Sequence, residues 1–203
     1  MDKIMRFSAF VAVLFIVFPA VAGITPLKAA LADKVLGKAS AAVTIYEYSS
    51  LTCPHCRAFD LDTLPKLKKD YIDSGKVRLI YRDFPLDPIA LAGAMLARCV
   101  GAERYFGMIE AIFRSQKAIT GSDAPLAELK RIGRLGGLSG EEAASCIGNK
   151  KLMRRIQSRA KEAEREYKVN STPTFVIAGT VVRGNLAYAD FRDILDKALA
   201  AKK

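Results

Sequence analysis

The pattern of apolar and polar positions separates two strand-like ends of the chain from a long helical middle. Residues 43–49 and 77–82 are rich in β-branched and aromatic side chains, which predicts buried strands. From residue 89 onwards, apolar positions instead recur at the spacing of one face of an amphipathic helix. This period predicts helices near residues 89–100, 103–117, 125–135, 139–148 and 150–168.

Strand character returns near the C-terminus of the chain. Residues 174–177 and 180–182 predict a hairpin, and residues 188–201 predict a last amphipathic helix. A helical pattern over residues 57–71, in which Pro65 predicts a kink, separates the first two strands. A helix between two strands of one sheet implies a right-handed, parallel crossover.

This order of elements predicts an α/β fold that is interrupted by an inserted α-helical domain. We expect residues 41–87 and 168–203 to form the α/β part, and residues 88–167 to form the insertion. Residues 23–40 are expected to be an N-terminal linker, with room for a short helix or an edge strand.

The N-terminus has the three-part pattern of a secretory signal peptide. Lys3 and Arg6 precede an apolar run over residues 7–18, and Ala20 and Ala22 supply the small residues of a cleavage site. The alternative, a membrane anchor, is disfavoured because the run is shorter than the ~20 residues that span a bilayer. We therefore expect residues 1–22 to be a signal peptide that is cleaved near Ala22, and the protein to be periplasmic. Export permits disulfides between the four cysteines.

The most informative motif is Cys53-Pro54-His55-Cys56, which follows the first strand and opens a helix. Cys53 at the helix start would lie among free backbone N–H groups, and Pro54 suits the first helical position. His55 can add a positive charge or a hydrogen bond beside the sulfur, so each neighbour is expected to lower the pKa of Cys53. Cys53 is predicted to be the exposed nucleophile and Cys56 the resolving thiol of thiol–disulfide exchange.

A metal site, a static disulfide and a hydrolase are the alternatives for this motif. A zinc site requires about four ligands, whereas His55 is the only histidine and no second CxxC motif exists. A CxxC disulfide closes a very small loop, so it would stabilise the fold little. A lone histidine inside the motif also leaves no separate partner for a Ser-His-Asp or Cys-His hydrolase. We expect no metal and no cofactor.

The sequence resembles the DsbA-like branch of the thioredoxin superfamily over nearly the whole chain after residue 22. The resemblance rests on three segments, which are residues 43–56 (VTIYEYSSLTCPHC), residues 81–86 (YRDFPL) before the helical insertion, and residues 171–175 (STPTF). It implies a thioredoxin fold with an inserted helical domain. It also implies activity on reduced, unfolded exported proteins, with reoxidation by a quinone-linked, DsbB-like membrane partner.

The same resemblance assigns roles to residues outside the motif. Thr172 and Pro173 match a loop with a cis proline that lies against the reactive cysteines and, with Pro54, contacts substrate. An ordinary trans proline at the start of an edge strand is the alternative. Glu47 matches a buried acid that assists proton transfer near the resolving cysteine, unless it is a solvent-facing strand residue.

Cys99 and Cys146 remain as a second pair of cysteines. Some DsbA-like proteins carry an extra disulfide in the helical domain, and this pair resembles it. Such a bridge would close a loop of about 48 residues, for which the chain-entropy treatment gives ~4 kcal/mol of stabilisation. We expect a structural disulfide, ahead of a redox relay or a metal site.

The net charge of +11 is compatible with nucleic acid or anionic membranes as partners. The basic residues are spread over helix faces, so no nucleic-acid role is expected. Residues 150–168, the most basic stretch, are expected to form a solvated helix, or else a docking surface for an acidic partner or anionic lipid.

The sequence thus favours a monomeric thiol–disulfide oxidase. The first alternative is a disulfide isomerase or reductase on the same fold. Thr172 precedes Pro173, and a threonine before this proline resembles the isomerase and reductase branches too. The second alternative is a module that binds peptides or acts as a chaperone without catalysis.

Overall fold

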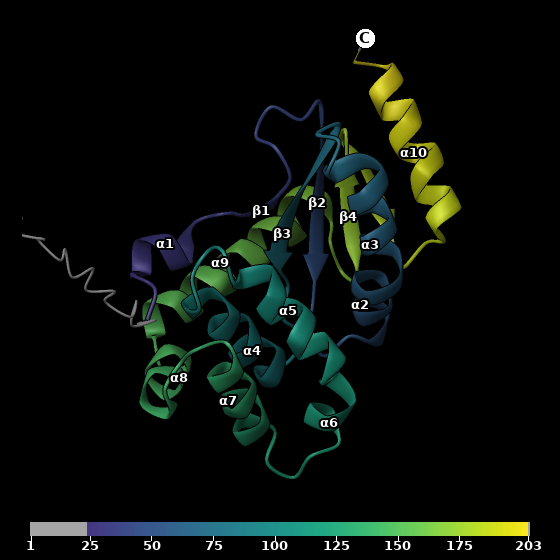
Figure 1. The fold of residues 1–203 in the computed structure, drawn as a ribbon. Coiled ribbons are helices and arrows are strands. Elements are labelled where there is room, and N and C mark those ends of the chain that lie inside the picture. The colour runs from purple at the N-terminus through teal and green to yellow at the C-terminus, as the bar shows by residue number, and fades with distance from the viewer. Residues whose placement is uncertain (1–23, 203) are drawn as a thin grey trace, which may run out of the picture.

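The strands predicted at the two ends of the chain meet in one sheet. The computed structural model describes residues 24–202, so the predicted signal peptide lies outside the described residues. Five strands lie in the order β1-β3-β2-β4-β5 at the centre of the molecule (Figure 1). They are β1 (Lys34–Leu36), β2 (Val43–Ser49), β3 (Val77–Asp83), β4 (Thr174–Ile177) and β5 (Thr180–Arg183).

The pairing of the strands agrees with the predicted crossover. β2 and β3 are parallel, while β1 with β3, β2 with β4, and β4 with β5 are antiparallel. The segment expected as a linker contains both a short helix, α1 (Leu27–Leu31), and the edge strand β1. This segment is therefore part of the sheet as well as a connection.

One face of the sheet is covered by the helical run that follows the cysteine motif and by the C-terminal helix α10 (Tyr188–Ala200). Alternate residues of β2, among them Ile45 and Glu47, point to this face. Phe59, Phe175 and Phe191 pack against one another here, with ring centroids 4.6–5.3 Å apart. These aromatic contacts fix the position of the motif helix on the sheet.

The motif helix alternates between α-helical and π-helical segments. It consists of α2 (Pro54–Ala58), the π-helical segment η1 (Phe59–Thr63), α3 (Leu64–Leu67) and a second π-helical segment, η2 (Lys68–Ile72). Pro65 cannot donate a backbone hydrogen bond, and η1 ends two residues before it. The π-helical turns, which are wider than α-helical ones, lie on both sides of the short segment that contains Pro65.

The helical insertion gathers at one end of the sheet, except for its last helix (Figure 1). Its helices are α4 (Pro88–Cys99), α5 (Tyr105–Arg114), α6 (Gln116–Thr120), α7 (Pro125–Leu135), α8 (Gly140–Ile147) and α9 (Lys150–Tyr167). The helix expected over residues 103–117 is divided into α5 and α6, because Ser115 leaves helical dihedral angles. Ser139 and Glu142 form the capping box at the start of α8.

Helix α9 covers the second face of the sheet. Ala163, on its buried side, packs with Tyr48 and Val176 of β2 and β4. Nearer its start, Leu152 and Ile156 belong to the main core with the other inserted helices. Within residues 24–202, none of the helices combines the length and the apolarity that crossing a membrane requires.

Candidate active site

The reactive motif lies where β2 ends and the motif helix begins. Cys53 is the N-cap residue of α2, with extended backbone dihedral angles, and Pro54 is the first residue of the helix. The loop that precedes β4 lies against it, and its Thr172–Pro173 peptide bond is cis. The Cys53 thiol donates a hydrogen bond to the Thr172 carbonyl oxygen over 3.3 Å. The structure thus brings together two segments that are 119 residues apart in the sequence.

The prediction of an exposed nucleophile needs a correction. Cys53 is only 7% exposed. It is still the more accessible of the two, because Cys56, one turn deeper, is wholly buried. Pro54 and His55 are the exposed members of the motif. The Thr172 carbonyl oxygen lies 3.3 Å from the Cys53 sulfur and contributes to its burial.

The two thiols have opposite pKa shifts. A hydrogen bond from the Cys56 thiol lowers the pKa of Cys53 to about 5, with further contributions from the Thr172 side chain and from backbone N–H groups of the helix start. Burial opposes this shift but does not overcome it. Burial raises the pKa of Cys56 above the usual range of a thiol, and its hydrogen bond to Cys53 raises it further. One sulfur is therefore prepared as a thiolate and the other is held as a thiol.

His55 contributes to the pKa of Cys53 through its backbone. Its backbone N–H is among the groups that lower the pKa of Cys53. Its imidazole is exposed to solvent and makes no hydrogen bond within the described part of the chain. The position of His55 at the helix start therefore supports the Cys53 thiolate through the backbone.

Glu47 points inward, as the alternation of β2 suggested. Its carboxyl is fully buried, and neither oxygen has a hydrogen-bond partner among the described residues. Burial raises the pKa of Glu47 well above the ordinary value, and the charge of Asp60 adds to the shift. Burial therefore favours the protonated form of this carboxyl group, which can give up a proton inside the fold.

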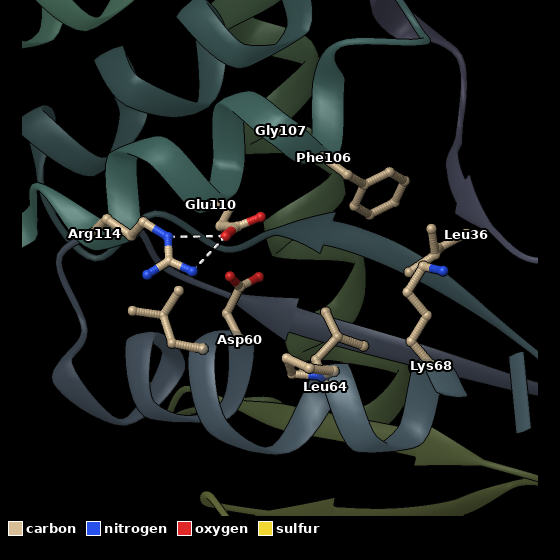
Figure 2. A pocket seen from close by; sticks show the side chains of 10 residues that line it. Leu36, Asp60, Leu64, Lys68, Phe106, Gly107, Glu110 and Arg114 are labelled. Carbon is tan, nitrogen blue, oxygen red and sulfur yellow. Dashed lines mark hydrogen bonds and ion pairs between the residues drawn. The ribbon is translucent and has the colours of Figure 1, made fainter. Parts of the chain in front are cut away.

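Asp60 is a residue that the sequence analysis missed. It lies four residues after Cys56, at the start of η1, and is 8% exposed. Burial and the negative charge of Glu110 raise the pKa of Asp60 to about 7, although Arg114 opposes the shift. Figure 2 shows its carboxyl group directed towards Glu110 and Arg114 across a cavity of about 410 Å³. An acid at the i+4 position after a cysteine, between apolar neighbours, was the available signal.

Gln116 is a second residue that the motif did not reveal. Its amide nitrogen donates to the carbonyl oxygens of Leu51 and Cys53, over 2.9 and 3.0 Å. Arg57, in α2, donates to the Phe113 carbonyl oxygen over 3.1 Å. These bonds attach the reactive loop and its helix to α5 and α6 of the insertion.

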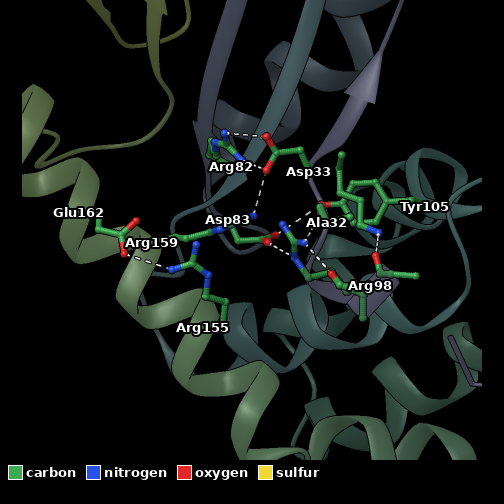
Figure 3. Close-up of polar contacts among 12 residues, drawn as sticks. Ala32, Asp33, Arg82, Asp83, Arg98, Tyr105, Arg155, Arg159 and Glu162 are labelled. Carbon is green, nitrogen blue, oxygen red and sulfur yellow. Dashed lines mark hydrogen bonds and ion pairs between the residues drawn. The ribbon is translucent and has the colours of Figure 1, made fainter. Parts of the chain in front are cut away.

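A buried ion pair joins β3 to the insertion at the same end of the sheet. Arg98, near the end of α4, binds Asp83 at the end of β3, and both side chains are 3% exposed. The same guanidinium donates to the carbonyl oxygens of Ala30 and Ala32, next to α1. Figure 3 shows Arg98 with its contacts to Asp83 and Ala32. Removing one member of such a pair would leave the other charge buried without a partner, which destabilises a fold strongly. The cluster therefore has a structural role.

Cys99 and Cys146 form a disulfide with a sequence separation of 47 residues. It joins the end of α4 to α8, and both residues are buried. Within residues 24–202, no group of three or more His, Cys, Asp or Glu side chains is arranged to hold a metal ion.

Comparison with known proteins agrees with this geometry. A protein family described as thioredoxin matches residues 30–197. The chain belongs to the thioredoxin family. Among the solved structures of this family, alpha-DsbA1 of Wolbachia pipientis superposes with a TM-score of 0.79 at 33% identity, over 84% of this chain and 92% of that one. The predicted DsbA-like thioredoxin fold with inserted helices is thereby confirmed.

Curated thioredoxin-family relatives point the same way. A putative protein-disulfide oxidoreductase of Rickettsia conorii is 34% identical over 172 residues, which cover 84% of this chain and 62% of that protein. A probable disulfide bond formation protein D of Bacillus anthracis is 31% identical, over 81% of this chain and 75% of its own length. The chain therefore spans less than two thirds of the rickettsial relative.

Proposed function

We propose that this protein is a thiol:disulfide oxidoreductase that transfers a disulfide from Cys53 and Cys56 to reduced substrate proteins. The opposite pKa shifts of the two thiols carry the proposal. A stabilised thiolate favours the reduced form of the motif, so the disulfide form is an oxidant. The names of the rickettsial and Bacillus relatives support the same class of reaction.

The mechanism begins with attack of a substrate thiolate on the Cys53 sulfur of the motif disulfide. The Cys53–Cys56 bond breaks, its electron pair stays on Cys56, and a mixed disulfide joins Cys53 to the substrate. A second substrate thiolate then attacks the substrate sulfur of the mixed disulfide and releases Cys53. Cys53 is a good leaving group because its thiolate is stabilised by the hydrogen bonds around it.

The cis-proline loop would hold the substrate during this exchange. Thr172 and Pro173 lie next to the Cys53 sulfur, and Pro54 is exposed beside it. An extended substrate segment that pairs with the loop backbone would bring its own cysteine to Cys53. Glu47 would supply the proton that Cys56 needs when it is released as a buried thiolate.

We further propose that the protein works in the periplasm on unfolded exported proteins, as a monomer that a DsbB-like membrane partner reoxidises. The signal-like pattern of residues 1–22 supports export. Mass analysis of the protein isolated from the periplasm tests this point, because a mature chain that begins after Ala22 is expected.

The second candidate function is a disulfide isomerase or reductase. Thr172 before the cis proline leaves this direction open, and a solved protein-disulfide isomerase of Novosphingobium aromaticivorans superposes with a TM-score of 0.72 at 26% identity. Redox titration against glutathione separates the candidates. An oxidase has a potential near the ~−120 mV of strong oxidants, whereas a value near the ~−270 mV of reductants would contradict the proposal.

A direct test uses oxidation of a reduced peptide with two cysteines. The wild-type protein should oxidise the peptide, and Cys53→Ser should reduce the rate to that of the uncatalysed reaction because no nucleophilic sulfur remains. Thiol trapping with mass analysis is the suitable measurement, since the chain has no tryptophan. A Cys53→Ser variant of full activity would favour a binding module without catalysis.

A further inference from the structure

The outward face of helix α9 carries a row of positive charges. Residues three or four positions apart share one face of an α-helix. On the side away from the core, this spacing selects a row of exposed residues, namely Lys150, Arg154, Gln157, Lys161 and Arg165. We refer to this row as the α9 stripe, and its length at the helical rise is ~22 Å. All its side chains except that of Gln157 are cations, and none is an acid.

The α9 stripe keeps its positive charge because nearby acids do not pair with it. The ion pairs of α9 within residues 24–202 join Arg155 to Glu162 and Arg159 to Asp33, so neither includes a stripe residue. Glu164 borders the stripe, since it shares a surface hollow with the stripe side chains. An exposed run of charge of one sign attracts a partner of the opposite sign. The charge of this face therefore calls for an anionic occupant.

The stripe lacks the apolar side chains that a protein partner would require. The core of a protein–protein interface is apolar and depleted in charged residues. In the described part of the chain, none of the exposed large apolar side chains belongs to α9; they are Ile24, Val35, Leu86, Leu126 and Leu135. Lipid headgroups need no such core, because the flexible stems of Lys and Arg carry the charge to the anionic surface. A straight row of cations on a helix thus suits a flat anionic bilayer better than a shaped protein surface.

The C-terminal end of the stripe lies beside the reactive site. Lys168, which follows α9, lines a surface hollow together with Leu86, whose side chain is 55% exposed. The Leu86 N–H donates to the Ser50 hydroxyl over 3.3 Å, and the Ser50 N–H donates to the Cys56 sulfur over 3.4 Å. A surface that binds the stripe would therefore also meet Leu86 and the edge of the reactive motif.

We propose that the α9 stripe binds the anionic headgroups of a membrane surface, with Leu86 as an apolar anchor at its end. The proposal rests on the function proposed above, in which a membrane partner reoxidises the motif. Each Lys or Arg close to an anionic bilayer strengthens binding about 5-fold. Binding along α9 would confine the protein to the membrane surface and keep the Cys53–Cys56 motif near the plane in which that partner lies.

The first experiment measures sedimentation of the protein with lipid vesicles. Every variant is used as isolated and has the same N-terminus, so residues 1–22 contribute equally to all of them. The wild type should bind vesicles of phosphatidylglycerol and phosphatidylcholine in equal parts far better than vesicles of phosphatidylcholine alone. Salt at ~1 M should release it, because the screening length falls to ~3 Å from ~30 Å at ~0.01 M.

A triple variant tests whether the stripe makes this contact. Arg154→Gln/Lys161→Gln/Arg165→Gln removes three exposed cations and retains residues that favour a helix. Its affinity for the anionic vesicles should fall by about 100-fold, which is the product of three ~5-fold losses. Its oxidation of the two-cysteine peptide should equal that of the wild type, because no stripe side chain contacts the motif. That activity also shows that the variant is folded.

A matched control removes the same charge from the opposite face of the molecule. Lys66, Lys69 and Lys197 are exposed and belong to the motif helix and α10, which cover the other face of the sheet (Figure 1). Lys66→Gln/Lys69→Gln/Lys197→Gln should therefore weaken vesicle binding by less than ~5-fold, the contribution of a single cation at the surface.

The second experiment tests the place of Leu86 with fluorescence. The chain contains no tryptophan, so Leu86→Trp introduces a single reporter of its surroundings. Anionic vesicles should shift its emission to shorter wavelength, because tryptophan enters the interface between headgroups and acyl chains. Leu126→Trp, at a residue of α7 that is 44% exposed, is the control and should show no shift.

Each outcome has a distinct meaning. Equal vesicle affinities of the stripe variant and the control variant would overturn the α9 stripe as the binding face, while the proposed function stands if both oxidise the peptide. Wild-type protein that binds duplex DNA but no anionic vesicles at low salt would overturn the choice of a membrane. Equal emission shifts of Leu86→Trp and Leu126→Trp would rule out the assigned anchor. Failure of the wild type to oxidise the peptide would defeat the proposed function, whatever the vesicles show.

Discussion

The two cysteine pairs of this protein contain the same chemical groups in opposite surroundings. Cys53 lies at the start of a helix, beside the Cys56 thiol and the backbone N–H groups that stabilise a thiolate. Cys99 and Cys146 connect two helices inside the insertion and are 2% and 1% exposed. The difference teaches that helix starts and polar neighbours, rather than the presence of two cysteines, make a disulfide reactive.

The largest expected effect comes from removing the second pair. Cys99→Ala/Cys146→Ala opens a loop with a sequence separation of 47 residues, which should lower the free energy of unfolding by ~4 kcal/mol in the chain-entropy treatment. Unfolding in urea under non-reducing conditions measures the change. Reduced wild-type protein, in which the same bridge is open, is the control.

This variant also tests whether the two pairs are independent. It should still oxidise the two-cysteine peptide at temperatures where it is folded, because the surroundings of Cys53 are unchanged. Loss of peptide oxidation by the folded variant would contradict the separation into a reactive and a structural pair.

The next effect concerns the thiolate of Cys53. With a pKa of about 5, Cys53 should react with iodoacetamide at pH 6 almost as fast as at pH 8. An ordinary thiol with a pKa near 8.5 would be a thiolate in only about one part in 300 at pH 6. Peptide mapping after timed alkylation identifies the modified residue. Alkylation of Cys56 before Cys53 would contradict the assigned order of the two thiols.

The sign of the linked stability follows from the same shift. The folded, reduced protein has a lowered Cys53 pKa, so its stabilisation is fully present above the ordinary thiol pKa. It is lost as the pH falls through about 5.

The smallest expected effect concerns the buried acid Glu47, which belongs to neither cysteine pair, and the pH dependence of stability. Burial raises the pKa of Glu47, so its contribution to stability is fully present below the ordinary carboxyl pKa. It is lost as the pH rises towards the raised value. Glu47→Gln should therefore weaken the decline of stability above about pH 4.5 by up to ~1.4 kcal/mol per pH unit. Denaturant unfolding at several pH values measures it, with Glu162→Gln, on the far face of the sheet, as the control.

The sequence predicted what short segments determine. The strand before Cys53, the capping box at Ser139 and the proline loop each depend on neighbours within a few residues. The order of strands and helices was enough to predict the parallel crossover and the insertion. The signal peptide and the functional roles of the site residues remain predictions.

What the sequence did not predict depends on packing between distant segments. Cys53 is less exposed than expected because the Thr172 loop covers it from 119 residues away. The pKa of Asp60 is raised by the charge of Glu110 and lowered by that of Arg114, and both residues belong to α5. Gln116 belongs to no motif in the sequence, yet its side chain donates hydrogen bonds to the reactive loop. Such contacts follow from the tertiary fold and leave no local pattern.

The two hydrogen bonds of Gln116 bear on whether the inserted helices are structurally independent of the reactive loop. An inserted domain can be expected to fold without affecting the site of the domain that carries it. Here the Gln116 side-chain amide, from the inserted helices, donates hydrogen bonds to the carbonyl oxygens of Leu51 and Cys53. Both carbonyls lie on the loop that carries the nucleophile. A shortened protein without residues 88–167 would lose the Gln116 hydrogen bonds to those two carbonyl oxygens. The insertion and the reactive loop thus form one structural unit, although they are distant in the sequence.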